Sequence, residues 1–183
     1  MTVDWSSYEV FNPGIEGLPE NHSRKAARLA YQRLMDAKPR RIEILSRLLK
    51  CDGIDLRNTD SSIQQVNDWF RGNVSPNIGA PERLLPEWYS VVNDLSLFLG
   101  DVMIERSPIL YWEFYIWGKK NVSYHRHVIM GFATEDPKYH TCLDIDRALA
   151  VYGHRVVSRE TVDSDEFLQW LEIAERRAGT RPD

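Results

Sequence analysis

Apolar residues recur at helical spacing through the first third of the chain. The i, i+3, i+4, i+7 pattern predicts a helix over residues 22–38, with Ala27, Ala30, Tyr31 and Leu34 on its apolar face. Pro39 can open a second helix, because its missing N–H costs nothing in a first turn. Thr59 and Asp60 are the candidate caps of a third helix that carries Ile63, Val66, Trp69 and Phe70.

Glycine and proline crowd residues 72–86, and this predicts a linker. The strongest helical pattern follows, from Glu87 to Glu105, and its broad apolar face indicates a buried helix. Gly100 lies inside that helix, where glycine costs about 1 kcal/mol relative to alanine. We therefore expect a close approach of another segment at Gly100.

Aromatic and β-branched residues gather after Pro108 and predict an antiparallel β-hairpin with strands at about 109–117 and 122–132. Two helices are predicted after it, from about Asp144 and from Asp163. Strands confined to one stretch of the chain indicate an α+β fold: an N-terminal helical layer, a long buried helix, the hairpin and two C-terminal helices. The length favours one domain over 1–183, with 1–75 and 84–178 as alternative subdomains.

Side chains alternate along the predicted first strand, so Trp112 and Phe114 share the core face. A four-residue loop pairs Trp117 with Val122 and places Glu113 opposite Arg126. The simpler interpretation is a cross-strand ion pair on a half-covered sheet. The functional alternative is a binding surface, since tyrosine, tryptophan and arginine are enriched at interfaces. Its candidate residues are Tyr111, Glu113, Tyr115, Trp117, Tyr124 and Arg126.

The net charge of −4 is mild and calls for neither a nucleic acid nor a membrane partner. The N-terminus has no basic start followed by an apolar run, and apolar stretches end well short of a membrane span. Two cysteines far apart in the sequence fit a reducing compartment. We therefore predict a cytoplasmic protein with no cofactor, and its oligomeric state is left open.

Two short groups of residues, of the types that bind metal ions, suggest an alternative function. His125 and His127 share one face of a strand, and His140 and Cys142 follow, so together they could hold zinc in a metal-dependent hydrolase. No CxxC or HExxH motif supports this interpretation. Ordinary hydrogen-bonded histidines are the stronger interpretation, and no metal is predicted.

Basic residues are concentrated in residues 22–50, which contain nine lysines and arginines but only two acidic residues, Asp36 and Glu43. A helix, a turn at Cys51–Gly53 and a further helix could imitate a helix-turn-helix that binds nucleic acid. The would-be recognition helix, 62–71, is polar but has Arg71 as its only basic residue. A solvated basic face is therefore favoured over a nucleic-acid interface.

The chain lacks the G-x-S-x-G, P-loop and G-x-G-x-x-G motifs, so catalysis is not the favoured prediction. Residues 84–157 carry a tryptophan-led helix ending in Leu99-Gly100-Asp101, then Trp112, Gly131-Phe132 and Pro137-Lys-Tyr139. This series resembles a set of uncharacterised bacterial proteins, some of which occur with toxin–immunity systems. The resemblance implies a small, non-catalytic, immunity-like protein that neutralises a partner protein.

Overall fold

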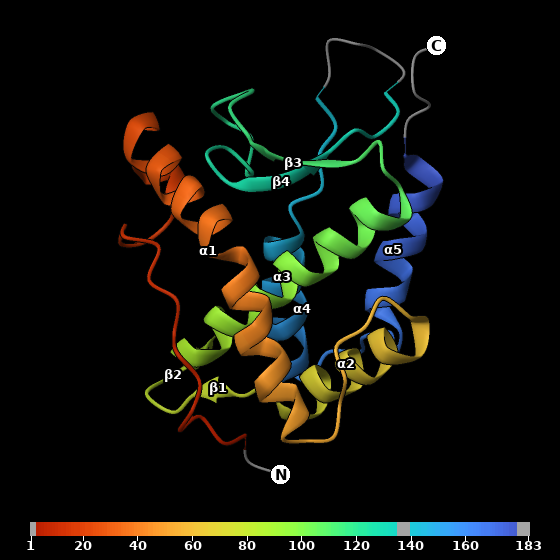
Figure 1. The fold of residues 1–183 in the computed structure, drawn as a ribbon. Helices are drawn as coiled ribbons and strands as arrows, with labels where there is room; N and C mark the ends of the chain where they lie inside the picture. The colour runs from red at the N-terminus through yellow and green to blue at the C-terminus, as the bar shows by residue number, and fades with distance from the viewer. Residues whose placement is uncertain (1–2, 135–139, 179–183) are drawn as a thin grey trace.

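The computed structural model describes residues 3–134 and 140–178, and it confirms the α+β fold (Figure 1). In chain order the elements are η1 (Pro19–Asn21), α1 (Arg24–Lys50), α2 (Asp60–Asn73), β1 (Pro76–Asn77), β2 (Ala80–Leu84), α3 (Pro86–Arg106), β3 (Tyr111–Phe114), β4 (His127–Met130), α4 (Ile145–Val157) and α5 (Glu166–Arg177). An N-terminal arm, residues 3–21, precedes α1 and runs alongside it (Figure 1).

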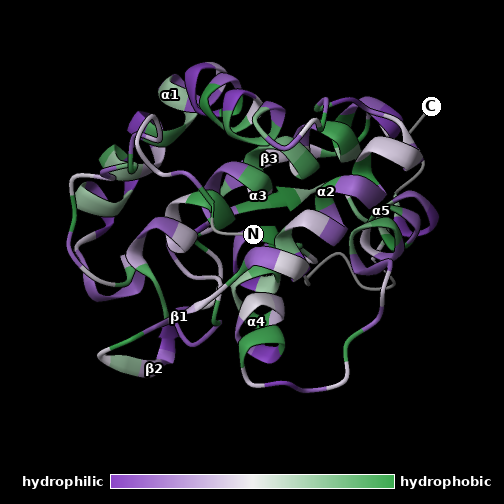
Figure 2. Ribbon diagram, turned by 90° about the horizontal axis from the view of Figure 1, so that it is seen from below, coloured by the Kyte–Doolittle hydropathy of each residue, from purple (hydrophilic) through white to green (hydrophobic). Residues whose placement is uncertain are grey.

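Helix α3 is the centre of the molecule, as its apolar pattern predicted. It packs against α1, α4 and α5, and the β3–β4 hairpin lies across one end of this bundle (Figure 1). Trp88 at its start is surrounded by the rings of Trp5, Trp69 and Phe70. One buried cluster joins residues of both predicted subdomains. The surrounding helices alternate hydrophobic and hydrophilic residues as each turns one face inward (Figure 2).

The prediction of two helices before residue 51 is wrong, because α1 is continuous through Pro39. Proline removes one hydrogen bond from a helix interior and bends it, and Figure 1 shows α1 changing direction along its length. Apolar residues on both sides of Pro39 bury in the same core, among them Leu34 and Leu45. The free energy gained by burying the apolar face of α1 therefore outweighs the local cost of the proline.

Of the two candidate caps of α2, Thr59 is the one used, since its hydroxyl accepts a hydrogen bond from the Ser62 N–H at 3.3 Å. The predicted linker at 72–86 is wrong in part. It contains the short antiparallel pair β1–β2, in which Pro76 is opposite Leu84. Leu84 is fully buried and β2 contacts α4, so this segment belongs to the body of the fold.

The hairpin exists, but it is shorter than predicted and its register differs by two residues. Glu113 is opposite Val128 and Phe114 is opposite His127, so the predicted pairing of Glu113 with Arg126 is wrong. The regular ladder ends at the pair of Phe114 and His127, and two residues earlier His125 has a φ of 66°, in the left-handed region. A shift of two residues preserves the alternation of faces, so Trp112 still faces the main core.

The close approach expected at Gly100 is present, and its partner is a side chain. The indole of Trp112 lies over Gly100, and a Cβ added there would overlap the ring. The same indole donates a hydrogen bond to Asp101 at 2.8 Å. Gly100 therefore makes room for the contact between α3 and β3.

We expect Gly100→Ala to lower the free energy of unfolding by about 1 kcal/mol or more, because overpacking costs about 1–3 kcal/mol and outweighs the gain in helix propensity. Gly72→Ala is the matched control, since a Cβ at that helical glycine meets nothing within 4 Å. The control should raise stability by up to about 1 kcal/mol in urea denaturation. Equal gains at both positions would contradict the packing described for Trp112.

Within the described residues, none of the helices has both the length and the apolar character needed to cross a lipid bilayer.

Candidate functional site

The six residues predicted to form a binding face do not form one open surface. Tyr115 is only 4% exposed and packs with Val128 and Met130, whereas Tyr111 is 48% exposed. The half-covered position predicted for Tyr115 is therefore wrong. Trp117 stacks on His140 with ring centroids 4.3 Å apart, so the chain after β3 folds back over this side of the hairpin.

Arg126 is held by α4 instead of by Glu113. Its Nε donates to Asp144 at 2.6 Å, and one terminal nitrogen donates to Asp146 at 2.6 Å. Burial alone would lower the pKa of the guanidinium, but the charges of Asp146 and Asp144 raise it. Asp144 also caps α4 by accepting the Arg147 N–H at 3.0 Å. The acidic start of α4 therefore anchors the segment before β4.

The residues of the metal alternative do not come together. Among the described residues, no three His, Cys, Asp or Glu side chains are close enough to hold a metal ion. His125 and His127 lie beside Phe114 and Trp112, as the face assignment predicted. His140 and Cys142 lie on the other side of the hairpin, against Trp117 and Tyr115.

The basic residues of α1 are largely engaged within the chain. Within the described part of the chain, five of the nine form ion pairs, namely Lys38, Arg40, Arg41, Arg47 and Lys50. The predicted recognition helix is also engaged, since Gln64 and Asn67 of α2 both donate to the Ser164 carbonyl. Nucleic-acid binding by these helices therefore gains no support.

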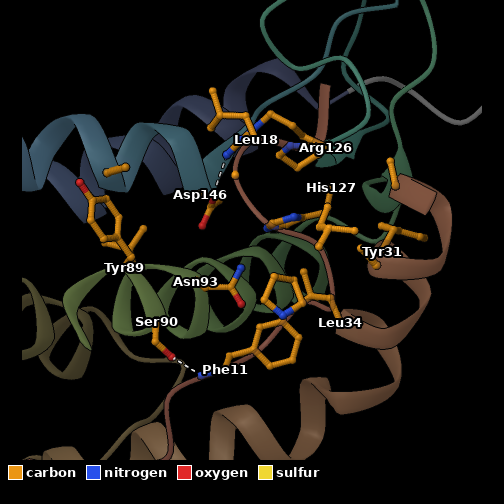
Figure 3. A pocket seen from close by; sticks show the side chains of 18 of the residues that line it. Phe11, Leu18, Tyr31, Leu34, Tyr89, Ser90, Asn93, Arg126, His127 and Asp146 are labelled. Carbon is orange, nitrogen blue, oxygen red and sulfur yellow. Dashed lines mark hydrogen bonds and ion pairs between the residues drawn. The ribbon is translucent and has the colours of Figure 1, made fainter. Parts of the chain in front are cut away.

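A cavity of about 310 Å³ lies between the N-terminal arm, α1, α3, the start of β4 and α4 (Figure 3). Most of its wall is apolar, with Phe11 and Ile15 from the arm and Leu34 from α1. Asn93 of α3 and His127 of β4 point into the same space (Figure 3). Its size is at the lower end of the range for small-molecule sites, which are commonly apolar with a few polar groups.

A buried polar network fixes the arm as one wall of this cavity. Arg41 donates to both carboxylate oxygens of Asp94, at 2.8 and 2.7 Å, and to the Glu9 carbonyl at 2.6 Å. Tyr8 donates to Asp94 at 2.5 Å. Burial, together with the negative charge of Asp94, raises the pKa of Tyr8, so its hydroxyl keeps its proton. The network orders the arm residues that continue into the cavity wall.

The cavity wall includes polar groups whose hydrogen-bonding capacity is not used. The His125 ring is 96% buried, and neither of its nitrogens has a hydrogen-bond partner in the described part of the chain. The same holds for the Oδ1 atom of Asn93. A buried polar group without a partner costs about 1–3 kcal/mol. Such groups beside a cavity indicate a place where a bound molecule can supply the missing partners.

His127 is a neutral hydrogen-bonding group at this site. Burial lowers the pKa of its imidazole, although the charges of Asp146 and Asp144 act in the opposite direction. Its Nε2 lies 3.4 Å from the Ser96 hydroxyl, which already donates to the Asn93 carbonyl at 2.7 Å. Nε2 therefore acts as the donor to Ser96, and Nδ1 of the neutral ring is left as an acceptor.

The lowered pKa of His127 predicts a loss of stability in mild acid. The unfolded chain takes up a proton near pH 6.5, whereas the folded ring does not until its lower pKa is reached. Stability should therefore fall as the pH drops below about 6.5, by up to about 1.4 kcal/mol per pH unit. His127→Gln should remove the contribution of this histidine to the dependence of stability on pH. Urea denaturation between pH 7 and pH 5 measures that dependence. His140→Gln, at an exposed ring, is the matched control, and an equal effect of both changes would contradict the prediction.

The geometry around Ser96 does not activate it as a nucleophile. Ser96 beside His127 could suggest an activated serine, but Ser96 is completely buried and its proton is directed to a backbone carbonyl. A nucleophile needs its base to accept that proton and needs access to the substrate. Ser96 therefore acts as a support for His127.

No protein-family model matches the chain, and neither the curated proteins nor the solved structures contain a significant match. The interpretation of the cavity therefore depends on its own geometry.

Proposed function

We propose that the protein is a non-catalytic binding protein whose ligand site is the cavity beneath the N-terminal arm. The carrying observation is the His125 ring, which lines the cavity and has both nitrogens buried without a partner among the described residues. Apolar walls supply the affinity for a small organic molecule, and the polar groups orient it. A non-catalytic binding protein was also predicted from the sequence, but the binding site proposed here is the cavity and not the hairpin face.

The test uses N-phenylnaphthylamine, an uncharged probe whose fluorescence rises in apolar surroundings. Ala30 lines the cavity and is 9% exposed, so Ala30→Phe should fill the space and weaken probe binding by about tenfold or more. Leu29→Phe is the matched control on the same helix, at a position that is 57% exposed, and it should bind as the parent does.

Circular dichroism confirms that each variant is folded, and Leu34→Phe provides a second way to fill the cavity if Ala30→Phe is unstable. Absence of probe binding by the parent protein would overturn the proposal. Binding that ignores both cavity-filling changes would place the probe elsewhere and would overturn it equally.

The immunity-like role implied by the resemblance stays a prediction, as does a cytoplasmic location. It requires a partner protein, and its test is co-purification with the product of a neighbouring toxin-like gene. Tyr111 is the member of the predicted face that is most available to a protein partner.

A further inference from the structure

Resting on the proposed function, the geometry points to a ligand class: a small organic cation, with an ammonium or amidinium group on an apolar body. Three features of the site support it, namely an excess of carboxylates, hydrogen-bond acceptors without partners and a wall that contains aromatic rings. Each feature comes from a different set of side chains.

The first feature is the charge balance where α4 meets the cavity. Asp146 lines the cavity, and Asp144 shares the guanidinium of Arg126 with it. Glu20 also acts on Arg126 through its charge, so three carboxylates accompany one cation. Among the described residues, Arg126 is the only lysine or arginine that lines the cavity, and Asp144 and Asp146 already match its charge. An anionic ligand would therefore add to a negative surplus, whereas a cation would reduce it.

The second feature is the kind of hydrogen bond that the site offers. Asn93 lines the cavity, and its Oδ1 atom is an acceptor without a partner in the described part of the chain. Nδ1 of the neutral His127 ring is an acceptor as well. A ligand that carries N–H groups would supply donors to these two acceptors.

The third feature is the set of aromatic rings in the cavity wall. Phe11 of the arm, Tyr31 of α1 and Tyr89 of α3 line the cavity (Figure 3). Aromatic faces attract cations, and they also pack against an apolar body. Together the three features favour an organic cation over an uncharged molecule, and either of these over an anion.

The test compares naphthalene carboxamidine, carboxamide and carboxylate with the same ring position substituted. These molecules have nearly the same shape and carry charges of +1, 0 and −1 at pH 7.5. Each displaces N-phenylnaphthylamine from the parent protein, and the midpoints give their relative affinities. We expect the amidinium to bind more tightly than the amide, and the carboxylate to bind at least about tenfold more weakly than the amidinium.

Glu20→Gln removes one of the three carboxylates and keeps the side-chain size. It should reduce the preference for the amidinium over the amide by about threefold, and salt should weaken this effect. Glu16→Gln, at an exposed position of the same arm, makes the same change in net charge and should leave the preference unchanged.

Equal affinities of the three compounds, or tightest binding of the carboxylate, would overturn this inference and leave the binding site itself in place. Failure of the parent to bind N-phenylnaphthylamine would overturn the proposed function instead. An unaltered preference in Glu20→Gln would show that the charge surplus does not select the ligand, and would also count against the inference.

Discussion

Replacing Asp94 by alanine is expected to lower the free energy of unfolding by about 3–5 kcal/mol. Asp94 is fully buried, and its partner Arg41 is 3% exposed. Alanine at this position would leave the guanidinium inside the protein without a counter-charge, and removing one partner of a buried pair is costly for that reason. Tyr8 would lose its 2.5 Å hydrogen bond to the same carboxylate.

Urea denaturation with an unchanged m-value is the measurement for Asp94→Ala. Arg40→Ala is the matched control, because Arg40 binds Glu9 of the same arm but is 68% exposed in its side chain. That exposed pair should contribute less than about 1 kcal/mol. Similar losses in the two variants would contradict the buried network.

The double change Arg41→Met with Asp94→Leu separates the charge effect from lost packing. Apolar replacement of both partners of a buried ion pair is often neutral or stabilising. Tyr8 would keep a partner, since its hydroxyl lies 3.1 Å from that of Ser90. The double variant should therefore be more stable than Asp94→Ala alone. The arm should also resist proteolysis better in the double variant, because no unpaired charge is left beneath it.

Elements in which apolar residues recur at a regular spacing could be predicted from the sequence, because burial of their apolar face decides whether they form. Helix α3 and the start of α2 at Thr59 are examples. The hairpin register could not be predicted, since it depends on the left-handed backbone of His125, a conformation that non-glycine residues rarely adopt. The predicted exposure of Tyr115 failed for the same reason: the longer connection folds over it, and Asn121 donates a hydrogen bond to its hydroxyl.

The cavity had no signal of its own in the sequence. Its wall comes from the arm, α1, α3, the start of β4 and α4, so no short motif contains it. His125, His127 and Arg126 were singled out, but as metal ligands or as parts of the hairpin face. Asp146 was explained by its position at a helix start, an explanation that holds for many acidic residues. Only the packing of distant segments brings these residues to one space.

The second large effect is expected at Trp112, whose replacement by alanine should cost about 3–5 kcal/mol of stability. Its indole fills the space over Gly100, donates to Asp101 and lies 5.8 Å from the His127 ring. Truncation would open a cavity between α3 and β3 and remove a support of the proposed ligand site. Tyr111→Ala is the control one position earlier, where the exposed ring should contribute less than about 1 kcal/mol.

Both variants are compared by urea denaturation, and probe binding is measured under conditions where each is folded. Trp112→Ala should weaken N-phenylnaphthylamine binding as well as stability, because His127 loses the ring beside it. Tyr111→Ala should change neither quantity, since its side chain points away from the main core. A larger loss of stability in Tyr111→Ala than in Trp112→Ala would mean that the two faces of β3 are exchanged. Trp112 would then have no link to the cavity through His127, because the contact between these two rings requires Trp112 on the core face.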